Sequence, residues 1–141
     1  MRRFVRYICI ILVLASLITL PAFASEQRSS DFFAASSVYL WKISDTQFEV
    51  WFDVTAVQSM DELGASEIKV QRSTDKENWT TMRTYSKANY SQMIDTHTAT
   101  HADCVTYTYT SGYYYRAIVV LYAKNSSGTG EVTEVTPTKW F

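Results

Sequence analysis

The residues best suited to chemistry lie in one short segment, DTHTATHADC, at positions 95–104. It contains two aspartates, one cysteine and both histidines of the chain, His97 and His101. On a helix these histidines would share a face and could bind a metal ion. The alternating threonines favour a strand, where they would stand about 13 Å apart at about 3.3 Å per residue, too far for one ion. We therefore predict a solvated loop without a metal or a cofactor.

A catalytic use of the same segment would need Cys104 as a nucleophile, with His97 or His101 as the base. Thiol catalysis requires a thiolate, an oriented base and an oxyanion hole. The chain has only 4 glycines, and none of them forms a loop that would supply such a hole. Cys104 opens a predicted strand, where a free cysteine usually behaves as a small apolar group. An enzyme built on residues 95–104 is accordingly the third of three functional hypotheses.

Exposed aromatic residues offer a different chemistry, that of binding. The run GYYYRAIVVLYAKNSSGTGE, which begins at Gly112, alternates between two faces. Its outward face carries an apolar row: Tyr114, Ile118, Val120 and Tyr122. Trp51 also stands on the polar face of its strand, between Glu49 and Asp53. Such aromatic rows can stack on sugar rings or bury against a protein partner. Another strand, or the poorly patterned segment 87–103, could equally cover them.

The elements that must carry these residues are short strands. The clearest spans residues 46–57, where Phe48, Phe52 and their apolar neighbours alternate with polar residues at a period of two. Further strands are predicted at 38–43, 67–72, 79–85, 105–110, 113–124 and 131–136. A turn, or one helical turn, is expected in QSMDELGAS at 58–66, and Pro137 is expected to end pairing. The pattern predicts an antiparallel β-sandwich of about seven strands.

The N-terminus, MRRFVRYICIILVLASLITLPAFA, predicts an export signal. Three arginines precede an uncharged apolar run at 8–20, which is shorter than the roughly 20 residues of a membrane span. Ala22 and Ala24 give the small-x-small pattern that signal peptidase recognises, so we expect cleavage between Ala24 and Ser25. The Ser- and Ala-rich segment 25–37 is expected to be a flexible leader, with a single domain at 38–141.

Charge and cysteine content narrow the class of partner and the compartment. The chain has 13 basic and 14 acidic residues, and loss of the signal arginines would make it more acidic. Because phosphate binding needs clustered cations, we expect no nucleic-acid partner. Cys104 would be the only cysteine left after cleavage, so no internal disulfide is expected. Secreted animal domains are often rich in disulfides, which favours a bacterial exported protein.

Two segments resemble a known family. IKVQRSTDKENWTTM, at 68–82, resembles the C strand, turn and C′ strand of bacterial fibronectin type III-like domains. GYYYRAIVVLYAKNSSGTGE, at 112–131, is similar to their F strand and F–G loop, with Tyr113 near the place of the corner tyrosine. MDELGASEI, at 60–68, together with YYYRAIVVLYAKNSSG also resembles a group of small secreted bacterial proteins of unknown function. The resemblance implies an immunoglobulin-like or fibronectin type III-like β-sandwich.

Taken together, these features predict a secreted or cell-surface binding module without catalysis, which recognises a protein or glycan partner. The expected contact residues are Tyr114, Ile118, Val120, Tyr122 and Trp51. A structural protein that self-associates into homo-oligomers through the same face is the second hypothesis. Fold alone does not decide between them, because one scaffold can carry many functions.

Overall fold

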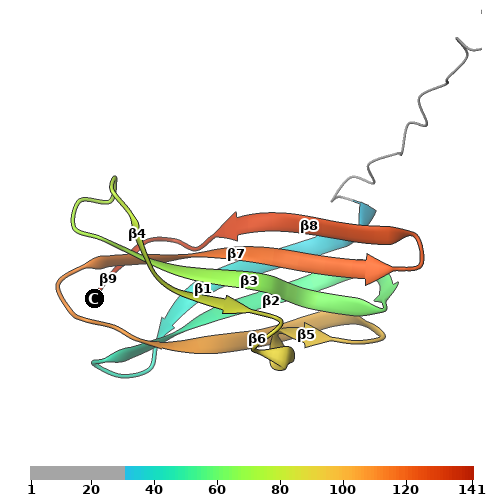
Figure 1. Cartoon of the computed structure of the whole chain (residues 1–141), viewed down its shortest axis with the longest axis horizontal. Helices are drawn as coiled ribbons and strands as arrows, with labels where there is room; N and C mark the ends of the chain where they lie inside the picture. The colour runs from blue at the N-terminus through green and yellow to red at the C-terminus, as the bar shows by residue number, and fades with distance from the viewer. Residues whose placement is uncertain (1–30) are drawn as a thin grey trace, which may run out of the picture.

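Two antiparallel β-sheets packed face to face make up the part of the chain that the structure describes, residues 31–141 (Figure 1). In this computed structural model the strands are β1 (Phe33–Lys42), β2 (Gln47–Met60), β3 (Glu62–Ser73), β4 (Thr80–Ser86), β5 (Ile94–Asp95), β6 (Thr98–Thr108), β7 (Tyr114–Asn125), β8 (Gly128–Val135) and β9 (Lys139–Trp140). A 3-10 turn, η2 (Ser91–Met93), precedes β5. The expected all-β sandwich is confirmed, with nine strands instead of about seven.

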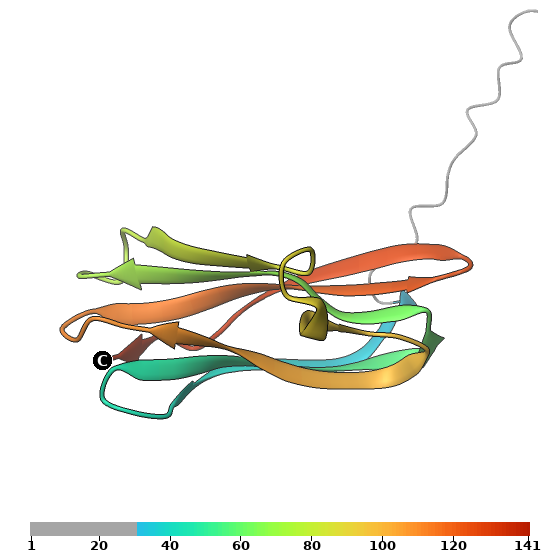
Figure 2. The ribbon, with the colours of Figure 1, turned by 60° about the horizontal axis from the view of Figure 1, so that its bottom comes forward.

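The two sheets differ in size. The smaller has the strand order β1-β2-β6, and the larger has the order β4-β3-β7-β8, with β5 added to β3 and β9 added to β7. Figure 2 shows them as two layers that run nearly the full length of the molecule. Each layer can therefore bury one face of its strands and expose the other. None of the residues 31–141 belongs to a helix long and apolar enough to cross a membrane.

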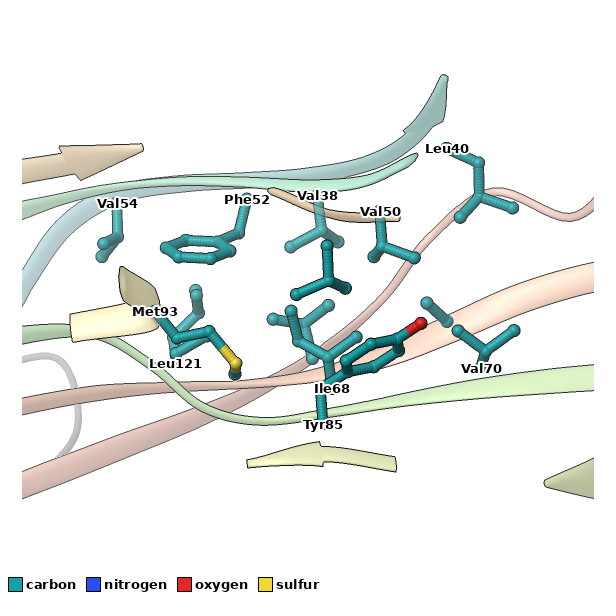
Figure 3. Packing of buried hydrophobic residues seen from close by; sticks show 14 of the residues in the cluster. Val38, Leu40, Val50, Phe52, Val54, Ile68, Val70, Tyr85, Met93 and Leu121 are labelled. Atoms are coloured by element: carbon teal, nitrogen blue, oxygen red, sulfur yellow. The ribbon is translucent and has the colours of Figure 1, made fainter. Parts of the chain in front are cut away.

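Period-two alternation explains the core, as the sequence predicted. The apolar set of β2 that includes Phe48 and Phe52 is fully buried. On β7, Tyr115 and the four alternate residues up to Ala123 are also fully buried. Figure 3 shows side chains from the smaller sheet, such as Phe52, facing side chains from the larger one, such as Leu121. The predicted inward and outward faces of β2 and β7 are therefore confirmed.

The start of the domain differs from the sequence-based expectation. Residues 33–37, expected to belong to a flexible leader, form the first half of β1, and Phe32 is fully buried. Serine and alanine side chains suggested flexibility, but pairing with β2 uses the backbone and needs no apolar side chain. The ring of Phe32 lies so close to Gly130 that a Cβ there would be 2.5 Å from Phe32 Cδ2. The rest of the expected leader and the predicted signal, residues 1–30, lie outside the described residues.

The predicted turn at 58–66 is also corrected. β2 continues to Met60 and β3 begins at Glu62, so Asp61 alone separates the strands as the chain crosses between sheets. Gly64 lies within β3 at φ +154°, and a Cβ on it would be 2.0 Å from the carbonyl oxygen of Met93. The close approach of η2 therefore requires glycine at position 64. The sequence had suggested only that Gly64 interrupts the local strand pattern.

Pairing also continues after Pro137, contrary to expectation. Proline does end β8, but Lys139 and Trp140 form β9 against the start of β7. This is possible because Pro137 lies between the two strands, where no ladder hydrogen bond is needed from it. The C-terminus is thereby tied to the larger sheet.

The tyrosine hydroxyl that reaches the upstream backbone belongs to Tyr115 and not to Tyr113, the residue expected near the corner position. The hydroxyl of Tyr115 donates to the carbonyl of Thr110 at 2.9 Å and accepts the Thr110 N–H at 3.1 Å. Its ring is fully buried, whereas Tyr113 is half-buried beneath the Arg72 guanidinium at 4.2 Å. The two tyrosines are two residues apart and share a face by alternation. Strand pattern could not distinguish them, and the path of the chain before β7 decides which hydroxyl reaches the backbone.

Candidate functional site

The outer face of the smaller sheet carries three neighbouring aromatic rings, Tyr39, Trp41 and Trp51, which we call the outer aromatic cluster. Trp41 is 59% exposed and Tyr39 is 40% exposed, while Trp51 is half-buried. Tyr39 lies directly opposite Trp51 across the β1–β2 pair, and their rings are parallel within 3° at a centroid distance of 6.2 Å. With Ile43 and Glu49 these rings line a shallow hollow of about 270 Å³.

Glu49 places a carboxylate in this hollow. It lies directly opposite Trp41 in the β1–β2 pair. Its Oε2 accepts a hydrogen bond from Trp51 Nε1 at 2.8 Å, which fixes both the indole and the carboxylate. The same carboxylate is also within hydrogen-bonding reach of the Cys104 thiol. Because a carboxylate has about four acceptor sites, it can still accept a further hydrogen bond from a ligand.

The structure brings the predicted row on β7 together, on the outer face of the larger sheet. Tyr114, Ile118, Val120 and Tyr122 are all half-buried there. The ring of Tyr114 packs on Trp140 at 4.6 Å and lies beneath the Lys76 ammonium at 4.5 Å. The ring of Tyr122 similarly lies 3.5 Å beneath Lys87 Nζ. The two tyrosines at the ends of the row are therefore partly covered by the protein itself.

The centre of the row on β7, at Ile118 and Val120, is less covered. Ile118 is directly opposite Val135, a residue that is 50% exposed, and Val120 is the next outward residue on β7. On the other side of the row, β3 supplies a polar rim through Glu67 and Lys69, whose side chains form a 2.7 Å ion pair. Trp51 is not part of this surface, because it belongs to the opposite sheet.

Residues 95–104 do not form a loop, since β6 starts at Thr98 as an edge strand of the smaller sheet. The candidate chemical groups are spread along it. His101 and Cys104 are three residues apart, which places their side chains on opposite faces of β6. A ring nitrogen of His101 lies 3.0 Å from the Gln92 carbonyl oxygen. Burial first, and then the negative charge of Glu49, raise the pKa of the Cys104 thiol to about 11. The thiol is therefore protonated at neutral pH and is a weak nucleophile.

Metal-binding geometry is not found in the described part of the chain. Within residues 31–141, no three side chains of the ligating types His, Cys, Asp and Glu converge on a common point.

A larger hollow of about 400 Å³ lies between the edge strands β4 and β6. It is lined by Arg83, Tyr85, Tyr90 and β6 residues around Thr106. Its polar groups bond to one another: the Tyr85 hydroxyl donates to the Thr106 carbonyl at 2.7 Å, and Arg83 donates to the Tyr90 hydroxyl at 2.9 Å. The Tyr85–Thr106 bond joins β4 of the larger sheet to β6 of the smaller one, and the Arg83–Tyr90 bond ties β4 to the loop that follows it. Both bonds have a structural role.

Sequence reasoning identified Trp51 but missed Tyr39 and Trp41 as its neighbours. The available signal was their alternation on one face of the strand at 38–43. That pattern does not say which face is outward, because Val38 and Leu40 alternate on the other face of the same short strand and are the buried ones.

Comparison of the chain with protein-family models, curated proteins and solved structures gives no match.

Proposed function

We propose that this protein is an exported, non-catalytic binding module and that the outer aromatic cluster is its contact surface. The observation that carries the proposal is the exposure of Trp41 beside Tyr39 and Trp51 on a flat sheet face. Large aromatic side chains are enriched at binding hot spots because they bury much area with little loss of side-chain entropy. Glu49, fixed by the Trp51 indole, adds a polar contact that can orient a ligand.

The scaffold of the proposal is a fibronectin type III-like or immunoglobulin-like module of bacterial origin. The buried Tyr115, bonded to the backbone of Thr110, supports it, because a tyrosine corner of this kind is a hallmark of immunoglobulin-like sandwiches. The segments that resemble the family, 68–82 and 112–131, fall on the hairpins β3–β4 and β7–β8. Such a rigid sandwich can present a binding face without moving.

Export of the protein is part of the proposal and rests on residues 1–24. If these residues are a signal peptide, the secreted protein begins at Ser25. Intact-mass measurement of protein recovered from culture medium should show the loss of residues 1–24. Recovery of a chain that retains Met1 would contradict export by this route.

Self-association through the larger sheet is a second candidate, supported by the exposed Val135 beside Ile118 and Val120. Light scattering on the purified protein should then show a stable oligomer. Replacing Ile118 and Val120 by threonine keeps β-propensity and removes apolar area, so this double variant should be monomeric and folded. A wild-type monomer at high concentration would exclude this candidate. The enzyme hypothesis has no comparable support, because the Cys104 thiol has a raised pKa.

Binding is tested with Trp41→Ala, an exposed-site substitution that should not affect folding. Co-sedimentation with isolated cell envelopes and insoluble extracellular material measures the bound fraction of the wild type. The Trp41→Ala variant should lose most of that binding. The Ile118→Thr/Val120→Thr variant serves as the matched control on the opposite face and should retain it. Equal retention by wild type and Trp41→Ala would show that the outer aromatic cluster is not the contact surface.

A further inference from the structure

We infer that the outer aromatic cluster recognises a cationic side chain, arginine or lysine, presented by a protein partner. This inference rests on the proposed function and adds the chemistry of the partner.

The face that holds the cluster is negative, and the paired residues of β1, β2 and β6 place no cation on it. Direct pairing across β1, β2 and β6 defines which residues share this face. Glu49 and Asp53 are its charged residues in the paired part of the three strands. The remaining ones are uncharged: Ala35, Ser37, Tyr39, Trp41, Gln47, Trp51, Thr55, Thr100, Ala102, Cys104, Thr106 and Thr108. Two carboxylates beside exposed aromatic rings attract a positive group and disfavour an anionic one.

The cations nearest to β1 are held elsewhere. The Lys42 ammonium lies 2.9 Å from Asp45 Oδ1, and the pKa of Lys42 is raised first by that hydrogen bond and then by Tyr109, on the inner side of the strand. Lys139 Nζ donates to the carbonyl of Leu40 at 2.7 Å, at the free edge of β1. Neither ammonium lies over a ring of the cluster, so the negative face stays available to a cation from outside.

Elsewhere in the described residues, several aromatic rings are covered by cations of the same chain. Five pairs place a cation 3.5–5.2 Å from a ring centroid: Arg72 on Tyr113, Lys76 on Tyr114, Arg83 on Tyr85, Lys87 on Tyr122 and Arg116 on Trp79. None of these rings belongs to the smaller sheet's outer face. Charges on the larger sheet are also matched, since Glu62 bonds both Lys87 and Lys124. The outer aromatic cluster is the surface where rings and carboxylates meet without a cation from residues 31–141.

The arrangement suits a planar cation in particular. A guanidinium can stack on an aromatic face while its N–H groups bond a carboxylate in the ring's vicinity. The parallel rings of Tyr39 and Trp51 present such faces, and Glu49 Oε1 can accept from the ligand while Oε2 bonds the Trp51 indole. A neutral sugar could stack on the same rings and donate hydroxyl hydrogen bonds to the carboxylate, but it would bind almost independently of salt.

The test follows the four tryptophan indole N–H signals by nitrogen-15 NMR during titration of the purified protein. The probes are a blocked pentapeptide with two arginines among glycines, the same peptide with glutamines in their place, and a neutral hexasaccharide, cellohexaose. We expect the arginine peptide to shift the signals of Trp41 and Trp51, with weaker binding when salt rises from about 0.02 M to about 0.3 M. The glutamine peptide should shift neither.

Variants then assign the interaction to its parts. Glu49→Gln should weaken binding of the arginine peptide by up to about fivefold, because an exposed ion pair contributes at most about 1 kcal/mol. Trp41→Ala should weaken it to a similar extent through loss of the cation–π contact. Trp140→Ala is the matched control, because Trp140 is nearly as exposed as Trp41, at 58%, but has cations around it. It follows Lys139 in the chain and packs on Tyr114, whose ring lies beneath Lys76. Its removal should leave binding unchanged.

Two results would overturn the inference. If cellohexaose shifts Trp41 and Trp51 and the arginine peptide does not, the cluster is a glycan site, and the proposed binding function remains. If the arginine and glutamine peptides bind equally, or neither shifts these signals, cation recognition is wrong. The binding function itself is judged separately, by co-sedimentation of Trp41→Ala.

Discussion

Removal of one hydroxyl group, by Tyr115→Phe, tests the arrangement that closes the end of the sandwich. The Tyr115 hydroxyl bonds both the carbonyl and the N–H of Thr110, at 2.9 and 3.1 Å. Phenylalanine keeps the buried ring and its packing on Phe48, whose centroid is 5.5 Å away. The substitution therefore removes two hydrogen bonds and leaves the apolar core essentially intact.

The expected loss of stability is about 2 kcal/mol. Each hydrogen bond contributes a net of about 0.5–1.5 kcal/mol, and two bonds give about 1–3 kcal/mol. Thr110 is exposed, so its backbone groups can turn to water and the full penalty of a buried unpaired group does not apply. For a domain of about 110 residues, a loss of 2 kcal/mol lowers Tm by about 8 °C.

Urea unfolding of wild type and variant, followed by tryptophan fluorescence and circular dichroism, measures the change. At an m-value of about 2 kcal/mol per M, the midpoint should fall by about 1 M. Tyr113→Phe is the control, because the Tyr113 hydroxyl makes no hydrogen bond within the described residues and its loss should cost less than about 0.5 kcal/mol. Equal effects of the two substitutions, or a larger effect of Tyr113→Phe, would refute a stabilising role for the Tyr115–Thr110 hydrogen bonds.

Three further predictions concern the core, a close contact and an ionisable group. Phe52→Ala should destabilise by about 3–5 kcal/mol because its ring is fully buried, whereas Asp53→Ala on the outer face should change stability by less than about 0.5 kcal/mol in the same urea melts. Gly64→Ala should cost more than about 2 kcal/mol, since its Cβ would lie 2.0 Å from the Met93 carbonyl oxygen; a wild-type thermal melt would contradict the described path of η2. The Cys104 thiolate absorbance should rise with a midpoint near pH 11 in the folded protein. Because the folded state disfavours the thiolate, the free energy of unfolding should fall as pH rises from about 9 towards 11. A midpoint at the ordinary pKa of cysteine would instead show an exposed thiol.

Much of the fold could be predicted because half-buried strands leave a period of two in the sequence. A strand that packs one face against a core must alternate between buried and outward residues. Every second residue is buried as expected, from Phe48 to Ala56 on β2 and from Tyr115 to Ala123 on β7. The same signal fails for β1, whose first half, from Phe33 to Ser37, is composed largely of small and polar residues. Backbone pairing with β2 orders that segment, and backbone hydrogen bonds leave no mark on side-chain composition.

Close approaches between distant segments were likewise invisible in the sequence. Gly64 looked like a turn residue, yet it is a strand residue beneath the Met93 carbonyl. Tyr113 and Tyr115 were equivalent by pattern, and the path of the chain at Thr110 selected Tyr115. Each of these choices depends on atoms brought together by the tertiary fold.

For the candidate site, the sequence by itself determined which side chains share a face of one strand. Alternation placed Tyr39 with Trp41, and Trp51 with Glu49. Only the tertiary structure decided that these two strands are neighbours, that Tyr39 lies directly opposite Trp51, and that the Tyr39–Trp41 face of β1 points to solvent. The physical reason is that pairing register and the position of the second sheet are set by contacts summed over the whole domain, whereas alternation is a property of a single strand.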